Sequence, residues 1–247
     1  MKRLFYSRLH RHILGKPEQR LRSYITDHPG HLDAAQRLHA EVYLAKGYIY
    51  EQDVNGDGKI NDIADPHKDG STYFVTTRIN EGGKEEVVAS ARHIRSHKKG
   101  GSDLPLLQQA SIEQKYRQEI QGYLPSQCVE VSALVKRRGF GMVASLLLYR
   151  EMWRHSRDRG DKLWLMACSP ALLKRLQQLF GSTLIQIGPP TPYTGEEIIP
   201  VMLKVEEGEA RLRREARRSW HPGRRFLYRE LLAFFTADDH FLLRQYD

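Results

Sequence analysis

The chain has 247 residues, a length that allows one large domain with additions or two small domains. It carries 39 Lys and Arg residues against 30 Asp and Glu residues, so its formal net charge is +9 and its expected partners are polyanions or acidic proteins. The mean hydropathy is −0.58, and no run approaches the roughly 18 apolar residues of a membrane span, which excludes a helical membrane protein. Because the N-terminus lacks a secretory pattern, we expect a cytoplasmic protein.

Positive charge is concentrated at the start of the chain, and we treat residues 1–30 as a basic N-terminal segment. Such a segment can contact nucleic acid, an anionic membrane surface or an acidic protein. A nucleic-acid-binding protein is the weaker, non-enzymatic hypothesis, because aromatic residues are not interleaved with the basic ones and no helix-turn-helix or finger spacing occurs. Peripheral membrane contact through this segment is compatible with an enzyme.

The first half of the chain predicts one helix and one hairpin. Hydrophobic spacing indicates a helix that Asp33 caps, that runs to about Lys46 and that Gly47 ends. A polar loop follows, and then STYFVTTRI and EEVVASARHI flank a glycine turn, as in an antiparallel β-hairpin. The polarity of residues 98–127 indicates an exposed loop with a short helix.

Strands and helices alternate over residues 128–187, an order that predicts an α/β sheet. The helix that ends at Gly160 should place Arg150 on its solvent side. Residues 206–247 predict a charged helical extension that packs its Leu and Phe side chains on the core. Covering an apolar channel or forming a dimer contact is the alternative use of this extension.

The run Lys-Arg-Arg-Gly-Phe-Gly-Met, residues 136–142, connects a predicted buried strand to a helix N-terminus. Successive backbone N–H groups and the helix dipole make such a loop an anion site, and glycine lets a phosphate approach the backbone closely. Two glycines also fit a tight strand-to-helix turn without any ligand.

This run resembles the signature of the GNAT acyltransferase superfamily, Gln/Arg-x-x-Gly-x-Gly/Ala, with Lys136 at its first position. Within the superfamily the chain resembles the autoinducer-synthase-like branch, which comprises acyl-homoserine lactone synthases, long-chain N-acyl amino acid synthases and exosortase-associated acyltransferases. The resemblance covers roughly residues 32–205, and we expect residues 31–205 to form a GNAT-like domain with a mixed central sheet flanked by helices. Its carriers are Gly47-Tyr-Ile, Asp65 to Val75, Arg92 in SARHIR, Glu130-Val-Ser132, and Ile187 to Gly195.

The resemblance implies an N-acyltransferase that takes an acyl group, long-chain in our interpretation, from an acyl carrier protein or coenzyme A thioester. The acceptor would be the amine of an amino acid or a similar small molecule. Lactone synthases usually have Glu-x-Ser-Arg, whereas this chain has Ala133 after Ser132. This departure argues against S-adenosylmethionine as acceptor, and a lactone synthase is kept only as an alternative. A coenzyme A-dependent small-molecule N-acetyltransferase is a second alternative, and no permanently bound cofactor is expected.

The resemblance also implies roles for individual residues. Glu130 would take the proton of the amine, although an ion pair with Arg92 or exposure to water also explains it. Backbone N–H groups near Ser132 would polarise the thioester carbonyl. Arg92, Asp65 and Asp69 would bind the acceptor, while a surface Arg and ordinary turn residues are the alternatives. The phosphopantetheine arm of the donor would bind Lys136, Arg137, Arg138, Gly139, Phe140, Gly141 and Met142.

A second motif lies in the polar loop, where Asp53, Asn55 and Asp57 follow the first half of a calcium-loop pattern. The twelfth position is Ala64 instead of the bidentate Glu. We therefore keep calcium as an alternative to a turn built from Asx residues.

Overall fold

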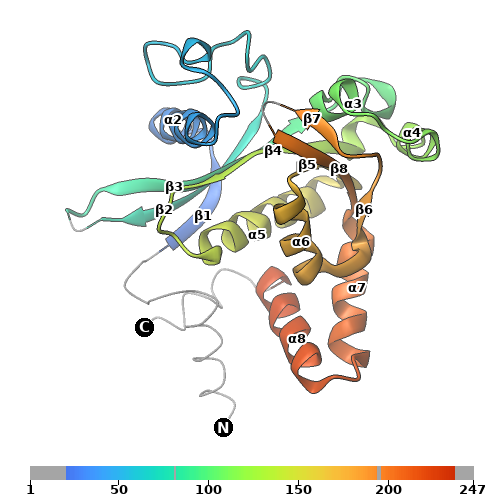
Figure 1. The fold of residues 1–247 in the computed structure, drawn as a ribbon. Helices are drawn as coiled ribbons and strands as arrows, with labels where there is room; N and C mark the ends of the chain where they lie inside the picture. The colour runs from blue at the N-terminus through green and yellow to red at the C-terminus, as the bar shows by residue number, and fades with distance from the viewer. Residues whose placement is uncertain (1–20, 81, 194–195, 237–247) are drawn as a thin grey trace. The chain divides into compact units, whose positions relative to one another are not determined.

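The computed structural model describes residues 21–80, 82–193 and 196–236 (Figure 1). Most of the basic N-terminal segment and the last residues of the predicted extension lie outside this range. The described residues form eight strands and seven α-helices, which confirms the mixed α/β class. None of these helices is both long and apolar enough to cross a membrane.

The chain divides into two compact units, each assembled from separate segments. Over the described residues, the first lies within 21–95, 130–152 and 192–196, and the second within 96–129, 153–191 and 197–236. The predicted division at residues 30 and 205 stays a prediction.

Four strands lie side by side in the order β1-β2-β3-β4. They are β1 (Leu21–Thr26), β2 (Thr72–Ile79), β3 (Glu85–Arg95) and β4 (Cys128–Lys136). β2 pairs antiparallel with β3, which confirms the predicted hairpin, and Tyr73 lies directly opposite Arg92. β1 is an additional strand within the segment that the sequence marks only as basic, and it pairs antiparallel with β2.

Two helices cover opposite faces of these strands in the first unit (Figure 1). On one face, α2 (Pro29–Ala45) packs Leu38 against Val75 and Val87 in a buried apolar cluster. On the other face lies the start of α5 (Met142–Arg159), where the Thr76 hydroxyl donates a 3.0 Å hydrogen bond to the Ala144 carbonyl.

The helix α2 begins four residues before the predicted start at Asp33. Pro29 occupies its first turn, where the missing N–H costs nothing. The Asp33 carboxylate pairs with Arg37 and Lys59 instead of capping the helix. Its end agrees with the prediction, since Gly47 has φ of 71°, a conformation that glycine adopts without strain.

The second unit contains β5 (Leu163–Cys168), β6 (Leu184–Gln186) and most of β8 (Glu196–Lys204), in the order β5-β8-β6. Both pairings with β8 are antiparallel, and the short β7 (Thr191–Tyr193) also pairs with β8. The helix α6 (Pro170–Phe180) follows β5 as predicted, and the Ser169 hydroxyl caps it by accepting from the Leu172 amide at 3.3 Å.

Two predictions of exposure are wrong. Residues 98–127 form α3 (Pro105–Gln109) and α4 (Gln114–Gln121), but Leu104 and Leu106 are fully buried, because a few apolar side chains suffice to anchor a polar segment. The Arg150 side chain is only 3% exposed and lies 3.5 Å from the Glu151 carboxylate. The solvent face of α5 is formed by Arg157 and Arg159, nearer its end.

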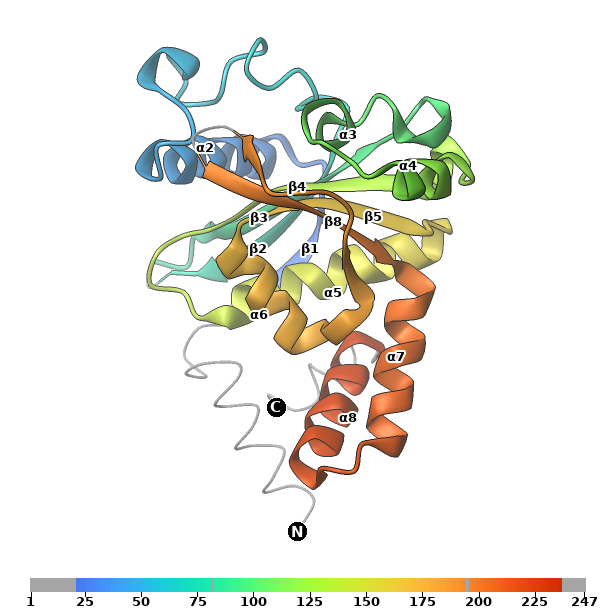
Figure 2. The same cartoon turned by 45° about the vertical axis from the view of Figure 1, so that its right-hand side comes forward.

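The helical extension is present over the described residues as α7 (Val205–Arg218) and α8 (Pro222–Thr236), which lie side by side (Figure 2). The Phe235 ring contacts the buried rings of Trp153 and Phe180, at centroid distances of 6.1 and 5.7 Å. Gly208 brings α7 against the same Trp153, because a Cβ placed there would lie 2.8 Å from the indole ring. An apolar anchor therefore fixes both helices within the second unit.

This close approach makes Gly208→Ala a destabilising substitution despite the higher helix propensity of alanine. Overpacking against a rigid ring costs about 1–3 kcal/mol and outweighs the gain in propensity of about 1 kcal/mol. Urea denaturation should show a lower midpoint for Gly208→Ala. Gly223→Ala, on the exposed first turn of α8, is the matched control and should retain the wild-type midpoint. Equal midpoints for both variants would contradict the packing of α7 on Trp153.

Candidate functional site

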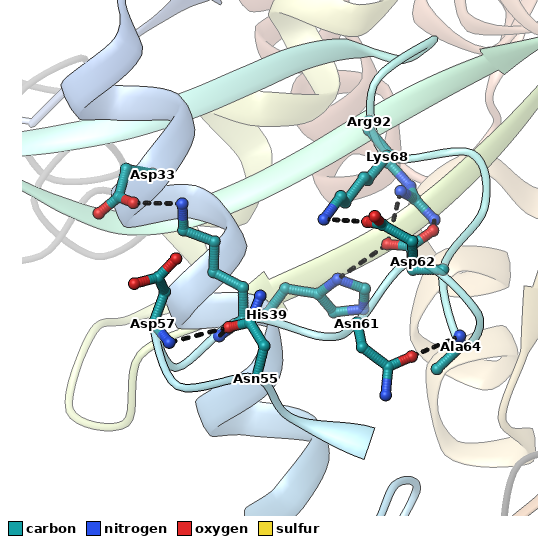
Figure 3. A network of polar contacts seen from close by, with 11 residues as sticks. Asp33, His39, Asn55, Asp57, Asn61, Asp62, Ala64, Lys68 and Arg92 are labelled. Atoms are coloured by element: carbon teal, nitrogen blue, oxygen red, sulfur yellow. Dashed lines mark hydrogen bonds and ion pairs between the residues drawn. The ribbon is translucent and has the colours of Figure 1, made fainter. Parts of the chain in front are cut away.

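A buried ion pair lies at the centre of the first unit. The Arg92 guanidinium, on β3, donates from Nη1 and Nη2 to the two oxygens of Asp65, at 2.8 and 2.7 Å (Figure 3). Only 5% of Arg92 and 7% of Asp65 is exposed. Burial disfavours the charge of Arg92, but the Asp65 carboxylate outweighs burial and raises the pKa of the guanidinium. Arg92 is thus not a surface residue of the hairpin, and it holds a loop carboxylate.

His39 adds a neutral imidazole to this pair. It lies on α2, with Nδ1 4.0 Å from Asp65 Oδ2 (Figure 3). Its ring packs edge-on against the Tyr43 ring, with the two ring centroids 4.1 Å apart. Burial, followed by the positive charge of Arg92, lowers the pKa of His39 to about 3, although Asp65 acts in the opposite direction. Its Nε2 is buried and has no hydrogen-bond partner among the described residues. The sequence analysis did not select His39, yet its spacing from Ala35 places it on the buried face of α2.

The strand β4 contains one more residue than the strand it pairs with. The Ser96 amide bonds the Cys128 carbonyl at 3.4 Å, and the Arg137 amide bonds the Val88 carbonyl at 2.9 Å. These two positions are nine residues apart along β4 (137 − 128) but eight along β3 (96 − 88), which requires a β-bulge between them. Ala133 marks the bulge, because its φ of 49° is a left-handed conformation rare for residues other than glycine.

The bulge lies opposite the buried ion pair. Counting from Arg137 brings Ala133 opposite Arg92, and counting from Cys128 brings Ser132 opposite the same residue. The second count also places Glu130 opposite Ile94, so Glu130 and Arg92 share a face of the strands. Glu130 is 3% exposed and Ser132 is half-buried. The predicted residues on β3 and β4 therefore converge on one point of the first unit.

The glycine loop begins where β4 ends. The Lys136 ammonium donates a hydrogen bond to the Phe140 carbonyl and bends the loop back on itself. Arg137 lies 3.7 Å from Glu41 and 3.6 Å from Glu86, so the protein's own carboxylates partly neutralise it. The Arg78 guanidinium covers the Phe140 ring, 4.9 Å from its centroid.

The turn of this loop is open to a ligand. Gly139, with φ of 94°, and Gly141 are exposed, and a Cβ at either position would meet no atom within 4 Å. Arg138 is exposed beside them, and Met142 then begins α5. The loop joins a strand to a helix of 18 residues, the setting in which backbone N–H groups bind phosphate.

The two acids predicted to bind the acceptor occupy different environments. Asp65 is buried against Arg92, whereas Asp69 is exposed on the loop that enters β2. The Lys68 ammonium pairs with Asp62, which raises the pKa of Lys68, and the negative charge of Asp69 acts in the same direction (Figure 3). The buried pair thus holds only the first of these two acids.

The alternative of calcium binding by the polar loop is not supported. Asp53 Oδ2 accepts from the Tyr50 amide at 2.9 Å, and Asn55 Oδ1 accepts from the amides of Asp57 and Lys59 at 3.0 and 3.1 Å. Side-chain oxygens of two of the three predicted ligands, Asp53 and Asn55, therefore stabilise the turn itself (Figure 3). Within the described range, no three His, Cys, Asp or Glu side chains are grouped as metal ligands.

No family model and no curated protein matches the sequence. Solved structures do match the fold. The N-acyl amino acid synthase FeeM, from uncultured soil microbes, aligns with a TM-score of 0.57 and 17% identity over 78% of this chain and 94% of its own. The acyl-homoserine lactone synthase LasI aligns with a TM-score of 0.55 and 13% identity, over 76% and 91% of the two chains. The coenzyme A-dependent lactone synthase BjaI aligns with a TM-score of 0.53 and 15% identity, over 78% of this chain and 89% of its own. The predicted GNAT-like fold is thereby confirmed.

The buried imidazole predicts a specific acid sensitivity. Because the pKa of His39 is about 3 in the folded protein and about 6.5 otherwise, the unfolded state takes up the proton first as the pH falls. The free energy of unfolding should therefore be unaffected by His39 above pH ~6.5 and fall by about 1.4 kcal/mol for each unit below it, down to pH ~3. In urea titrations from pH 7.5 to 4.5, the free energy of unfolding should fall less steeply with decreasing pH for His39→Gln than for the wild type. The variant His97→Gln, at an exposed position, is the control. The same pH dependence of unfolding free energy for the wild type and His39→Gln would refute the low pKa of His39.

The Arg92–Asp65 pair predicts that a second substitution partly rescues the first. Asp65→Ala leaves a buried guanidinium uncompensated and should cost about 3–5 kcal/mol of unfolding free energy. Adding Arg92→Met removes that charge and should recover part of the loss. Asp62→Ala breaks an exposed ion pair of the same loop and should cost less than about 1 kcal/mol. Chemical denaturation of all four proteins tests this, and a loss for Asp65→Ala no greater than that for Asp62→Ala would contradict the burial of the pair.

Proposed function

We propose that the protein is an N-acyltransferase that moves a fatty acyl group from a thioester to the amine of an amino acid or a similar small molecule. The observation that carries this proposal is the β4 bulge at Ser132 and Ala133, with the buried Glu130 two residues before it and an open glycine loop at the end of the same strand. One strand thus carries groups suited to three tasks: proton removal, carbonyl polarisation and phosphate binding.

Glu130 is the proposed base. An amine attacks a thioester only in its neutral form, so a carboxylate near the reacting carbon should take its proton, directly or through one water. A carboxylate that is 3% exposed on an otherwise apolar strand carries a high desolvation cost, which favours a functional reason for its presence. The proton passes from the amine nitrogen to a carboxylate oxygen as the new amide bond forms and the thiolate leaves.

The bulge is the proposed site of carbonyl polarisation. A bulge leaves one residue of the ladder unpaired, so a backbone N–H near Ser132 and Ala133 can turn toward a ligand instead of toward β3. A donor fixed in this way stabilises the oxyanion that forms during acyl transfer. The positive φ of Ala133 is the backbone strain that accompanies this arrangement.

The donor is proposed to lie along the glycine loop, with its phosphate against the N–H groups of residues 138–142. The exposed Arg138 then offers its charge to the phosphate or to an acidic carrier protein. BjaI and MesI are named as coenzyme A-dependent lactone synthases, and the resemblance described above implies carrier protein or coenzyme A, so both kinds of thioester are tested as donors.

Arg92 and Asp65 are proposed to act on the acceptor indirectly. Both Nη atoms of Arg92 bond Asp65, so the pair fixes the loop between α2 and β2 beside the bulge. The loop then forms one wall of the acceptor site. Ala133 in place of arginine favours an amino acid over S-adenosylmethionine as acceptor. N-acyl amino acid synthesis is therefore preferred to lactone synthesis.

The direct test is incubation of the full chain with acyl carrier protein or coenzyme A thioesters from acetyl to palmitoyl, together with pooled amino acids or S-adenosylmethionine. Mass spectrometry should detect an N-acyl amino acid formed from a long-chain donor. A lactone or an N-acetyl product would instead select one of the two alternatives. If no donor and acceptor pair gave any acylated amine, the proposed function would be wrong.

The base assignment is tested separately. Glu130→Gln should lower kcat by about 100-fold or more, because the amide cannot accept the proton. Glu113→Gln, which alters an exposed carboxylate paired with Lys115, should retain kcat within about twofold and controls for loss of a negative charge. Acylation at an undiminished rate by Glu130→Gln would leave the activity in place but exclude Glu130 as the base.

A further inference from the structure

The turn between α7 and α8 carries a fully exposed tryptophan. Trp220 is 101% exposed, whereas Trp153 and Trp164, the other two tryptophans of the chain, are 2% and 4% exposed. The anchor of the helix pair lies near its other end, where Gly208 and Phe235 meet Trp153. The turn is separated from β8 by the 14 residues of α7, or about 21 Å, and lies at the end of the helix pair away from β8 (Figure 2).

The same turn concentrates positive charge. Residues 213–225 contain six arginines and one acid, a local excess of +5 within a chain whose total is +9. Arg217 and Arg218, the last residues of α7, are exposed, and so is Arg225 in α8. Arg213, one turn earlier, pairs with Glu209, whereas residues 217–225 contain no acid. We call residues 217–225 the arginine tip.

We propose that the arginine tip docks this protein on an anionic lipid surface, with Trp220 in the interfacial layer. Tryptophan is the side chain that best tolerates the boundary between headgroups and acyl chains, because its ring is apolar and its N–H is polar. Flanking arginines contribute attraction to anionic headgroups, each strengthening binding about fivefold near the surface. This surface is made of described residues only, and a lipidic product would explain its use but is not required for it.

The observations favour lipid over the other polyanions. Single-stranded nucleic acid is held in grooves by successive aromatic platforms, whereas the tip presents one aromatic ring at the end of a helical hairpin. An acidic protein partner would complement the arginines, but burying one projecting indole needs a matching pocket. A bilayer interface accepts an isolated tryptophan without such a pocket.

The position of the tryptophans makes the test direct. With two of the three rings buried, a change in intrinsic fluorescence on adding vesicles reports on Trp220. The full chain should co-sediment with vesicles of phosphatidylcholine and phosphatidylglycerol at 3:1, with a blue shift of emission and quenching by brominated lipid. Phosphatidylcholine vesicles alone should bind about 100-fold more weakly or not at all, and 0.5 M salt should weaken binding to the mixed vesicles.

Matched variants distinguish binding through the arginine tip from a general effect of the protein's net charge. Arg217→Glu with Arg218→Glu should weaken vesicle binding by about 25-fold or more, and Trp220→Ser should abolish the blue shift. Arg157→Glu with Arg159→Glu makes the same change in net charge at exposed positions of α5 and should bind like the wild type. Acyl transfer to a soluble acceptor should be the same in all of these proteins, so failure of docking is distinguishable from failure of the proposed function.

Three results would overturn the proposal. One is equal vesicle binding by the Arg217 and Arg218 variant and the Arg157 and Arg159 variant. Another is the absence of a blue shift at saturating lipid. The third is binding of a 20-nucleotide oligomer, or of acyl carrier protein, that depends on Arg217 and Arg218 while vesicles do not bind.

Discussion

The ion pair between Arg92 and Asp65 is the interaction on which the arrangement of the first unit depends. It connects a strand in the middle of β1-β2-β3-β4 to a loop of more than 20 residues that has almost no regular structure of its own. Desolvating two charges is expensive, and replacement by apolar side chains is often equally stable. The pair is therefore better explained by what it positions than by what it adds to stability. It fixes a polar wall beside the β4 bulge, and the positive charge of Arg92 adds to burial in lowering the pKa of His39.

The bulge supplies the second constraint, and the two are linked through register. One extra residue in β4 shifts the pairing at the point where Arg92 lies opposite, so the strained backbone and the buried cation occupy neighbouring positions. Two of the three guanidinium nitrogens of Arg92 bond Asp65, which leaves few donors for a ligand. Chemistry at this point then relies on the backbone of β4 and on Glu130, while Arg92 works as a positioning residue.

Local patterns predicted the elements well where a short segment determines its own structure. The hairpin, the strand at residues 128–136, the helix after the glycine loop and the Ser169 cap all follow from spacing and turn residues within about 20 positions. The start of α2 was misplaced because Asp33 is a good capping residue whose charge is used by Lys59, 26 residues away. Exposure over residues 98–127 was misjudged because polarity averages over a segment, while burial is decided by single leucines.

The candidate site was predictable only in part. Resemblance selected Arg92, Asp65 and Glu130, but no periodicity could show that Arg92 would bond Asp65 bidentately instead of remaining on the surface. Nothing in the letters of Ser132 and Ala133 indicates a bulge, because alanine has no preference for positive φ. His39 was visible as a buried position of a helix, but its low pKa follows from burial and from Arg92, a residue that is distant in sequence and adjacent in space. Long-range register is the information that a single sequence lacks.

The division of the chain into interleaved segments has a consequence for synthesis. β3 is complete at residue 95, but its partner β4 follows only after more than 30 residues that belong to the second unit. While these residues emerge at about 5–20 per second, one edge of β3 has no strand beside it, and Arg92 has no bulge opposite it. An unpaired edge that carries buried apolar side chains is a template for misassociation. Early formation of the Arg92–Asp65 contact, which needs only residues 65–92, would give the nascent first unit a polar clamp before its sheet is complete.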